Sequence, residues 1–159
     1  MLDISKVTVS AESPLGKDAA VLLKKVAEEI YSRYSENGEH GTDSFKARDV
    51  TVPRSVFIVA RLDGRPVACG ALRPKSEYVA EVKRMYTEPD VRGRGVARRV
   101  LSALEKQARD FGYESIVLET GVRQPEALKV YEAMGYKRIA CYDEFANSEL
   151  SVCFEKQLT

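Results

Sequence analysis

Apolar residues recur along this chain with two different periods, and each period predicts one kind of secondary structure. Alternating or β-branched apolar runs predict strands at residues 6–10, 56–61, 66–72, 79–87, 115–120, 137–143 and 151–156. Spacings of three and four residues predict amphipathic helices that begin at Ser13-Pro14, at Val96 and at Gln124-Pro125. This order predicts an α+β fold: a single domain over residues 1–159, with a mixed, mostly antiparallel central sheet flanked by helices.

Glycines and polar segments mark where these elements end. Asp63-Gly64, between two apolar runs, is a strong hairpin signal. Gly112 and Gly135 stand where the C-caps of the second and third helices are expected. Residues 35–54 are polar and predict a long loop that holds a short helix near Phe45. Because long loops in compact domains are often functional, this segment is a candidate for ligand contact.

The most informative stretch is the glycine- and arginine-rich turn at residues 91–99, between a predicted strand and a predicted helix. The first N–H groups of a helix have no acceptor within it, and the helix dipole adds partial positive charge there. Gly93 and Gly95 allow a ligand to approach the backbone closely. The arginines at positions 92, 94, 98 and 99 can form charge-assisted hydrogen bonds with phosphate. The turn therefore predicts an anion site suited to a pyrophosphate.

Three phosphate-binding patterns can be compared with this turn. The P-loop pattern Gly-x-x-x-x-Gly-Lys-Ser/Thr does not occur in the chain. The dinucleotide pattern Gly-x-Gly-x-x-Gly fails because Arg98 stands in its last position. The pattern Arg-x-x-Gly-x-Ala does fit, at Arg92, Gly95 and Ala97. It resembles the acetyl-CoA loop of the GCN5-related N-acetyltransferases, the GNAT superfamily.

The resemblance extends from Ala80 to Tyr136 and covers several segments in the order that the family shows. It implies the GNAT fold and acetyl-CoA as cosubstrate, with the pyrophosphate on the glycine turn and the thioester arm along the preceding strand end. Gln124 stands where many relatives carry a cofactor-contacting Asn, although simple capping of the next helix also explains it. The cofactor-binding residues implied in this way are Met85, Tyr86, Thr87, Arg92, Gly93, Arg94, Gly95, Val96, Ala97, Arg98 and Gln124.

Tyr131 is the first of two residues that the resemblance implies for catalysis. It falls where the family often has a tyrosine that protonates the departing CoA thiolate, and a phenol is a suitable acid for that basic group. Ala127 and Met134 share its helix face, so a purely structural role in the core is the alternative.

Glu81 is the second, at a position where some relatives place the base that deprotonates the amine. A carboxylate whose pKa is raised by partial burial would suit this task. Pairing with Lys83 or Arg84 is the structural alternative. Two alternatives to Glu81 as the base remain: Glu119, at the end of the next strand, and transfer of the proton through water.

Composition narrows the classes of function. A formal net charge of +1 gives no global electrostatic case for binding nucleic acid or a membrane, and no apolar run reaches membrane-spanning length. Cys69, Cys141 and Cys153 lie in apolar runs, which predicts buried, reduced thiols in a cytoplasmic protein. His40 is the only histidine and no Cys-x-x-Cys pair occurs, so no metal site is expected.

The sequence therefore predicts an N-acetyltransferase that moves acetyl from acetyl-CoA to a primary amine of a small acceptor by direct attack. An acyltransferase that uses a longer acyl-CoA or a protein amine, and a non-catalytic CoA-binding sensor, are the alternatives, and a homodimeric assembly is left open. The acceptor is not identified. Acidic residues in the segments that hold specificity in the family could attract a cationic amine: Glu36, Glu39, Asp43, Asp143 and Glu144.

Overall fold

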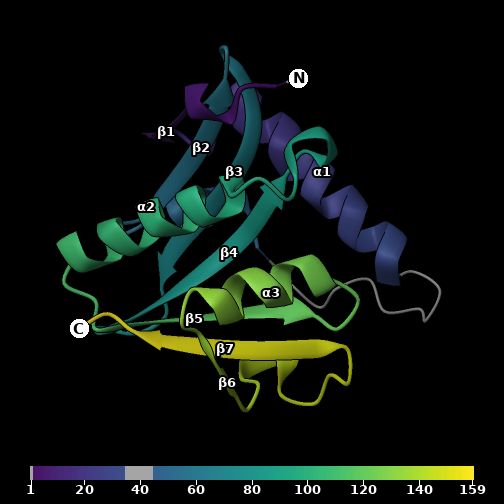
Figure 1. Cartoon of the computed structure of the whole chain (residues 1–159). Helices are drawn as coiled ribbons and strands as arrows, with labels where there is room; N and C mark the ends of the chain where they lie inside the picture. The colour runs from purple at the N-terminus through teal and green to yellow at the C-terminus, as the bar shows by residue number, and fades with distance from the viewer. Residues whose placement is uncertain (1, 35–44) are drawn as a thin grey trace.

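The structure, a computed structural model, describes residues 2–34 and 45–159 of the chain. Its centre is a seven-stranded sheet in the order β1-β2-β3-β4-β5-β7-β6 (Figure 1). Neighbouring strands are antiparallel except β4 and β5, which run parallel. The strands are Val7–Glu12 (β1), Val56–Leu62 (β2), Arg65–Pro74 (β3), Val79–Thr87 (β4), Ser115–Gly121 (β5), Lys137–Ile139 (β6) and Ser151–Gln157 (β7). The helices are Lys17–Tyr34 (α1), Val96–Asp110 (α2) and Pro125–Ala133 (α3).

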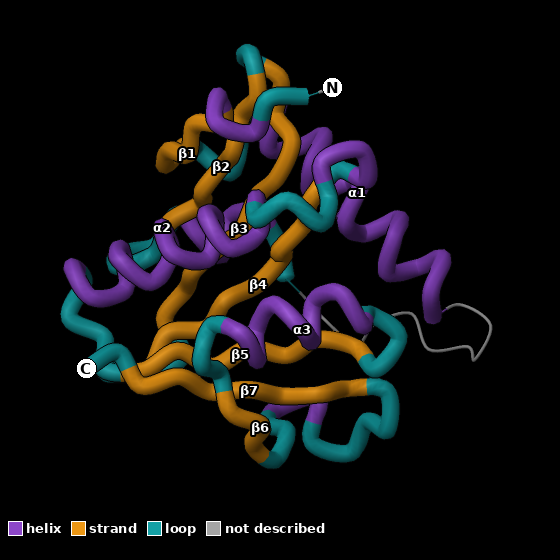
Figure 2. The backbone as a smooth tube through the Cα atoms, viewed as in Figure 1, coloured by secondary structure: helices purple, strands orange, loops and turns teal. Residues whose placement is uncertain are grey.

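The helices cover opposite faces of the sheet, as the alternation along the strands requires. On β2, Phe57 and Val59 belong to the core beneath α1, whereas Ile58 and Ala60 belong to the core beneath α2 and α3. Figure 2 shows α2 and α3 crossing in front of the strands, with α1 behind them. The predicted α+β architecture, with its mixed and mostly antiparallel sheet, is confirmed.

α2 presents an apolar stripe to the sheet at the spacing that the sequence predicts. Four of its side chains are fully buried: Val100, Leu101, Leu104 and Ala108. Burial of a leucine side chain stabilises the fold by roughly 1.5–3 kcal/mol. The helix ends at the expected cap, where Gly112 N donates to Arg109 O at 3.0 Å and Tyr113 N donates to Ala108 O at 3.0 Å.

Two predicted boundaries are wrong for local reasons. α1 begins at Lys17 and not at Ser13-Pro14, because Ser13 Oγ accepts a hydrogen bond from Leu15 N at 3.1 Å and closes a turn before the helix. The strand predicted at residues 137–143 is shorter: β6 ends at Ile139, and Asp143–Phe145 form a 3-10 turn.

The cysteine prediction is correct for one residue and wrong for two. Cys69 is a buried free thiol. Cys141 and Cys153 instead form a disulfide, with their Cα atoms 5.1 Å apart. The pairing of β6 with β7 sets Ile139 opposite Cys153, and this brings Cys141, two residues further on, within reach. A cytoplasmic location stays a prediction.

β4 and β5 separate partway along their length, and this creates the opening that holds the candidate site. Their pairing runs only from Val79 opposite Ser115 to Val82 opposite Leu118. Beyond that point β4 continues to Thr87 and β5 to Gly121 (Figures 1 and 2).

Within the described parts of the chain, no helix combines the length and the apolar character that crossing a membrane requires.

Candidate active site

Two cavities lie in and beside the opening between β4 and β5. The first, which we call the loop cavity, has a volume of about 570 Å³ and is bounded by the glycine turn, the end of β4 and α3. The second, the strand cavity, has a volume of about 330 Å³ and lies between the separated strands, α1 and the segment before β7. Met85, Gln124, Ala127 and Tyr131 line both cavities. The two spaces therefore meet around these four residues.

The glycine turn opens the loop cavity to backbone contact. Gly95 adopts a φ of +87° and is the N-cap of α2, with no side chain capping the first turn. A Cβ atom built on Gly95 would meet no atom within 4 Å, so its side of the turn faces open space. The first residues of α2, Val96, Ala97 and Arg98, line the cavity, and the first N–H groups of a helix have no acceptor within it. This confirms the predicted strand, turn and helix, and it suits an anion.

Most of the predicted cofactor contacts line the loop cavity together. Those that do so are Met85, Tyr86, Thr87, Arg92, Gly93, Gly95, Val96, Ala97, Arg98 and Gln124. Arg94 does not: it donates from Nη1 to Leu2 O at 3.1 Å and lies outside the lining. Arg99, which the sequence also offered to phosphate, donates to Val7 O at 2.7 Å. Both of these arginines contact the N-terminal segment.

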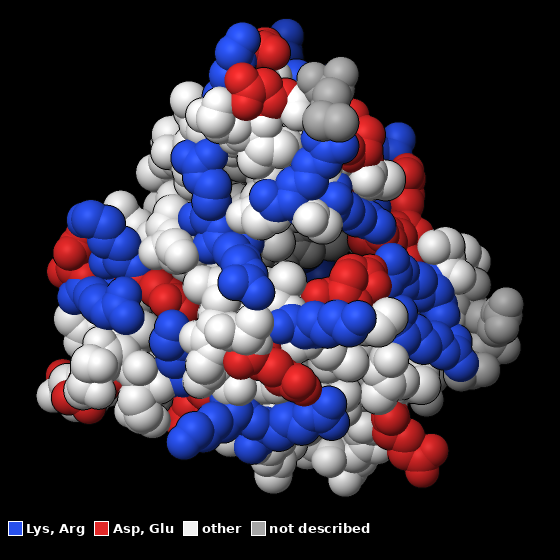
Figure 3. Space-filling view, in the orientation of Figure 1, with Lys and Arg blue, Asp and Glu red and all other residues white. Residues whose placement is uncertain are grey.

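The face of the molecule that carries α2 and α3 is hollowed where the loop cavity lies. Figure 3 shows Lys and Arg side chains around this hollow and acidic side chains at one edge of it. Arg98 is the lining arginine with no ion pair among the described residues, whereas Arg92 is held in a network. A local basic rim can attract an anionic ligand even though the whole chain is nearly neutral.

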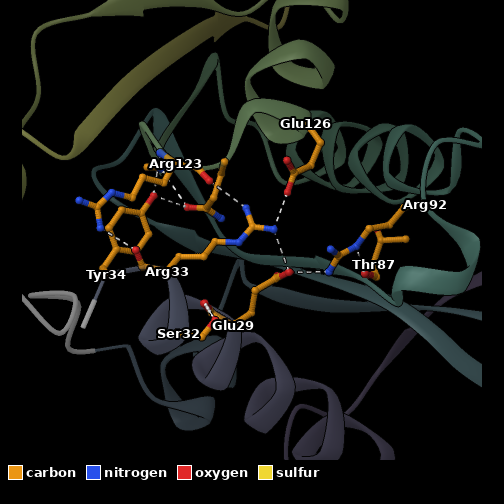
Figure 4. A network of polar contacts seen from close by, with 10 residues as sticks. Glu29, Ser32, Arg33, Tyr34, Thr87, Arg92, Arg123 and Glu126 are labelled. Atoms are coloured by element: carbon orange, nitrogen blue, oxygen red, sulfur yellow. Dashed lines mark hydrogen bonds and ion pairs between the residues drawn. The ribbon is translucent and has the colours of Figure 1, made fainter. Parts of the chain in front are cut away.

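The Arg92 network ties the turn to α1 and α3 (Figure 4). Arg92 Nε donates to Thr87 O at 2.7 Å, and its Nη2 lies 2.6 Å from Glu29 Oε1. Arg33 Nη2 lies 3.2 Å from the same Glu29 oxygen and 2.8 Å from Glu126 Oε1. Glu29 and Glu126 both line the loop cavity. Two arginines and two carboxylates thus bridge three elements at its mouth.

Gln124 contributes through its side chain to the same region. Its Oε1 accepts from Gly121 N at 3.1 Å and from the Tyr34 hydroxyl at 3.2 Å. A Cβ atom on Gly121 would lie 1.5 Å from the Tyr34 hydroxyl oxygen, so only glycine lets Tyr34 reach this backbone. Gln124 also precedes Pro125 at the start of α3, but its side chain does not cap that helix. Gln124 is nevertheless the N-cap residue of α3, where its main-chain O accepts from Ala127 N at 3.1 Å and from Leu128 N at 3.2 Å. The cofactor contact of its side chain stays a prediction.

Tyr131 lies where the two cavities meet. Its side chain is 5% exposed and its ring packs against Tyr136 and Phe154, with centroids 5.9 and 5.8 Å away. Burial, with a smaller contribution from the Glu119 carboxylate, raises the pKa of its phenol well above the usual value. The phenol is therefore neutral at physiological pH and keeps a proton to donate. The core role and the proton-donor role are compatible in this position.

Glu81 is placed differently from its predicted role. It is 4% exposed and lines neither cavity. Its Oε1 accepts from Arg73 Nε at 3.0 Å and its Oε2 from the Tyr142 hydroxyl at 3.1 Å. Lys83 Nζ lies 4.0 Å from Oε2. The structural alternative of an ion pair is thus realised, chiefly with Arg73 rather than with Lys83 or Arg84.

Glu119 does line the strand cavity, and its Oε2 accepts from Ser151 Oγ at 2.7 Å. The same cavity is lined by Tyr34, Lys83 and Arg84, which the sequence did not indicate as site residues. A local signal existed for Lys83 and Arg84. They are two adjacent charged residues within a strand, which is unusual for a strand buried in a sheet.

Of the acidic residues that were expected to attract the acceptor, only Asp143 and Glu144 belong to the described residues. Glu36, Glu39 and Asp43 lie outside the described residues. Asp143 Oδ2 lies 2.5 Å from Lys75 Nζ, and neither Asp143 nor Glu144 lines a cavity. In residues 2–34 and 45–159, no group of three or more His, Cys, Asp or Glu side chains is arranged as a metal site would be.

Comparison with known proteins agrees with this geometry. Residues 23–136 match the sequence profile of the Acetyltransferase (GNAT) family. An "IAA acetyltransferase" from Azospirillum brasilense is 32% identical over 96% of this chain and 98% of its own length. A candidate acyl-CoA N-acyltransferase from Klebsiella pneumoniae is 25% identical, with a TM-score of 0.78 over 96% of this chain and 98% of the other. A GNAT acetyltransferase from Elizabethkingia anophelis, solved with acetyl-CoA bound, shares the fold at 13% identity, with a TM-score of 0.66 over 96% of this chain and 98% of the other.

Proposed function

The chain belongs to the acetyltransferase (GNAT) family, and from this premise we propose that it transfers acetyl from acetyl-CoA to a primary amine by direct attack. One observation carries the proposal: the loop cavity and the strand cavity meet at Met85 and Tyr131, in the opening between β4 and β5. One space suits the cosubstrate and the other suits the acceptor. An enzyme that joins two substrates needs two such spaces with a shared wall, because it must bring the reacting atoms together.

In this proposal the loop cavity holds acetyl-CoA, which supplies the acyl thioester. The free N–H groups after Gly95 bind the pyrophosphate, and Arg98 adds a charge-assisted contact. Main-chain groups of Met85, Tyr86 and Thr87, at the separated end of β4, bind the pantetheine arm as an added strand would. Arg94 is left out of this set because its guanidinium is directed to the N-terminal segment.

The chemistry then needs a proton acceptor for the amine and a proton donor for the thiolate. Tyr131 is the proposed donor, because its phenol stays neutral and borders both cavities. The amine nitrogen forms a bond to the acyl carbon, the bond from that carbon to sulfur breaks, and the sulfur takes the phenolic proton. Tyr131 regains its proton from solvent before the next turnover.

Of the two carboxylates considered for the base, we favour Glu119. It lines the strand cavity, whereas Glu81 lines neither cavity and holds Arg73 and Tyr142. A general base must reach the proton that it removes, directly or through one water. A water bound to Glu119 satisfies this requirement, so the water-mediated route is compatible with the same residue.

The experiment is amine-dependent release of free thiol from acetyl-CoA, followed with a chromogenic thiol reagent, with the product identified by its gain of one acetyl group. We expect release to increase with added amine and acetyl-CoA to be used in preference to longer acyl-CoA thioesters. CoA should also raise the melting temperature, since a ligand in a hundredfold excess over its Kd stabilises the native state by about 2.7 kcal/mol. Stabilisation by CoA without any amine-dependent release would identify a CoA-binding sensor instead.

A further inference from the structure

The strand cavity has an uneven distribution of charge that bears on the acceptor. Its α1 side is apolar, with Val26 and Ile30 in the lining, and the segment before β7 adds the apolar residues Phe145 and Leu150. Its charged lining residues are concentrated at the point where the two strands part. A ligand in this cavity therefore meets an apolar wall and a charged corner.

Two cations lie on the β4 side of that corner. Lys83 is the first residue of β4 beyond Val82, the last position that pairs with β5, and its side chain is only 3% exposed. Its Nζ lies 4.9 Å from the centre of the Phe145 ring. Glu81 Oε2, which does not line the cavity, lies 4.0 Å from this Nζ, a long distance for an ion pair. A buried ammonium that lines the cavity attracts an anion there more strongly than an exposed one, because few water molecules screen the interaction.

Arg84 follows directly and adopts a φ of +57°, in the left-handed region that arginine rarely adopts. The position is a β-bulge: Cys69 pairs with Tyr86 and Ala71 with Lys83, so Arg84 and Met85 share one position on β3. Bulges redirect side chains, and here the bulged residue lines the strand cavity. Backbone strain of this kind is concentrated at functional sites.

A single carboxylate lies on the β5 side. Glu119 is the first residue of β5 beyond Leu118, the last position that pairs with β4, and so occupies on β5 the place that Lys83 occupies on β4. The corner thus offers positive charge on one strand and negative charge on the other. A molecule that carries a carboxylate and an ammonium a few bonds apart matches both strands at once.

Resting on the proposed function, we infer that the acceptor is a free α-amino acid with an apolar side chain. Its carboxylate pairs with Lys83 and Arg84, its amine faces Glu119, and its side chain packs against Ile30 and Phe145. Polyamines are disfavoured because the two cations would repel them. Protein N-termini and lysine side chains are disfavoured because they lack a free carboxylate next to the amine.

The test compares acceptors that differ in one group. L-phenylalanine, L-phenylalaninamide and 2-phenylethylamine present the same ring and a primary amine, but only the first has a carboxylate. Thiol release from acetyl-CoA should show a kcat/KM for L-phenylalanine about 100-fold above either analogue, the size of effect expected when a buried charge loses its partner. L-leucine and 3-methylbutylamine should repeat the difference.

Variants assign the effect to the two cations. Lys83→Met and Arg84→Gln should each reduce the preference for L-phenylalanine over 2-phenylethylamine by roughly tenfold or more, with the KM for acetyl-CoA unchanged. Arg84→Lys, which keeps the charge, should retain part of the preference. Lys106→Met is the matched control, because Lys106 is an exposed residue of α2 whose side chain pairs with Asp110. Folding of each variant is verified by the rise in melting temperature with CoA.

The outcomes separate the two proposals. Equal rates with all three phenyl compounds, or a preference that survives both Lys83→Met and Arg84→Gln, would overturn the inference about the acceptor and leave acetyl transfer to amines intact. A protein that CoA stabilises, but that releases thiol with none of these amines or with any wider amine set, would overturn the proposed function and the acceptor inference with it.

Discussion

The loop cavity and the strand cavity share a wall, yet they draw on the chain in different ways. The turn that bounds the loop cavity is one continuous segment, from the end of β4 through Gly95 to the first turn of α2. The strand cavity is assembled from α1, the separated parts of β4 and β5, and the segment before β7. In the proposed function, the first cavity recognises its ligand mainly through backbone N–H groups and the second through side chains.

This difference has a physical basis. A pyrophosphate needs N–H donors and the positive end of a helix, and any strand, glycine turn and helix in sequence can supply both. An acceptor is distinguished by its own shape and charge, and only side chains from several elements can surround it. A family with one cosubstrate and many acceptors would therefore keep the first kind of site and vary the second.

The largest effect is expected from Gly95→Val, which should abolish acetyl-CoA binding. The φ of +87° makes any β-branched residue strained there, and the new side chain would enter the space where the backbone meets the ligand. Gly64→Val is the matched control: Gly64 has a φ of +81°, a Cβ there also meets no atom within 4 Å, and it lies in the β2–β3 hairpin. Both variants should melt earlier than the wild type, but only Gly64→Val should keep the stabilisation by CoA. Retained CoA binding in Gly95→Val would contradict backbone recognition.

Tyr131→Phe should come next, with a kcat about 100-fold lower and an unchanged KM for acetyl-CoA. Tyr136→Phe is the control within the same ring cluster. The Tyr136 hydroxyl donates to Glu105 Oε2 at 2.7 Å, so its loss should lower the free energy of unfolding by about 1–3 kcal/mol. Because Tyr136 lines neither cavity, kcat should not change. Steady-state kinetics and denaturant unfolding measure the two effects. The assignment fails if Tyr131→Phe keeps full kcat.

Tyr131 and Tyr136 also predict how the stability of the protein depends on pH. Burial raises the pKa of both Tyr131 and Tyr136, so the native state holds these protons at a pH where the unfolded chain releases them. The stabilisation is complete below about pH 10, the ordinary pKa of tyrosine, and decreases as the pH rises further. Each Tyr→Phe variant should therefore lose less stability than the wild type between neutral and strongly alkaline pH. Equal alkaline losses in all three proteins would contradict the raised pKa values.

The sequence predicts those features of the fold and the site that depend on residues close together in the chain. The bounds of β4, the start of α2 at Val96 and the Asp63-Gly64 hairpin depend on neighbouring residues, and all three are confirmed. The contribution of Tyr34 depends on Gly121, nearly ninety positions away along the chain, because the glycine leaves room for its hydroxyl. No local pattern records such a contact.

The incorrect or redirected predictions about single side chains have the same origin. The position of Glu81 along the strand suited a general base. The pairing of β3 with β4 sets Arg73 opposite Glu81, and the two side chains form an ion pair. Cys141 and Cys153 are twelve positions apart, and only the pairing of β6 with β7 shows that they can join. Arg94 follows Gly93 in a motif that implied a phosphate contact, whereas the N-terminal segment accepts its hydrogen bond. In each case the pairing of strands or a contact with another segment, and not the local pattern, decides the role.

The choice of base is a finer test of the strand cavity. Glu119→Gln should lower kcat/KM by roughly 10- to 100-fold at neutral pH, with partial recovery at high pH, where the amine loses its proton unaided. Glu81→Gln should leave the pH profile unchanged in shape, although it weakens the ion pair with Arg73 and the fold around it. Rates measured across pH with one amine separate these results. A normal profile for Glu119→Gln, together with a flattened acidic limb for Glu81→Gln, would restore Glu81 as the base.

The smallest effect is expected at the mouth of the loop cavity, and its direction is an increase. Glu29 holds Arg92 through an ion pair of 2.6 Å and also lines the cavity, so its negative charge opposes an incoming phosphate. Glu29→Gln should release Arg92 and strengthen CoA binding a fewfold, since partly exposed ion pairs contribute only about 0.2–1 kcal/mol. The gain in affinity should shrink at high salt, because the Debye length falls to about 3 Å at 1 M.

Two control variants should leave the Kd for CoA unchanged: Lys106→Met and Glu132→Gln, on outer surfaces away from both cavities. A weaker affinity in Glu29→Gln, measured by calorimetry, would mean that this network holds the turn in its binding conformation rather than competing with the ligand.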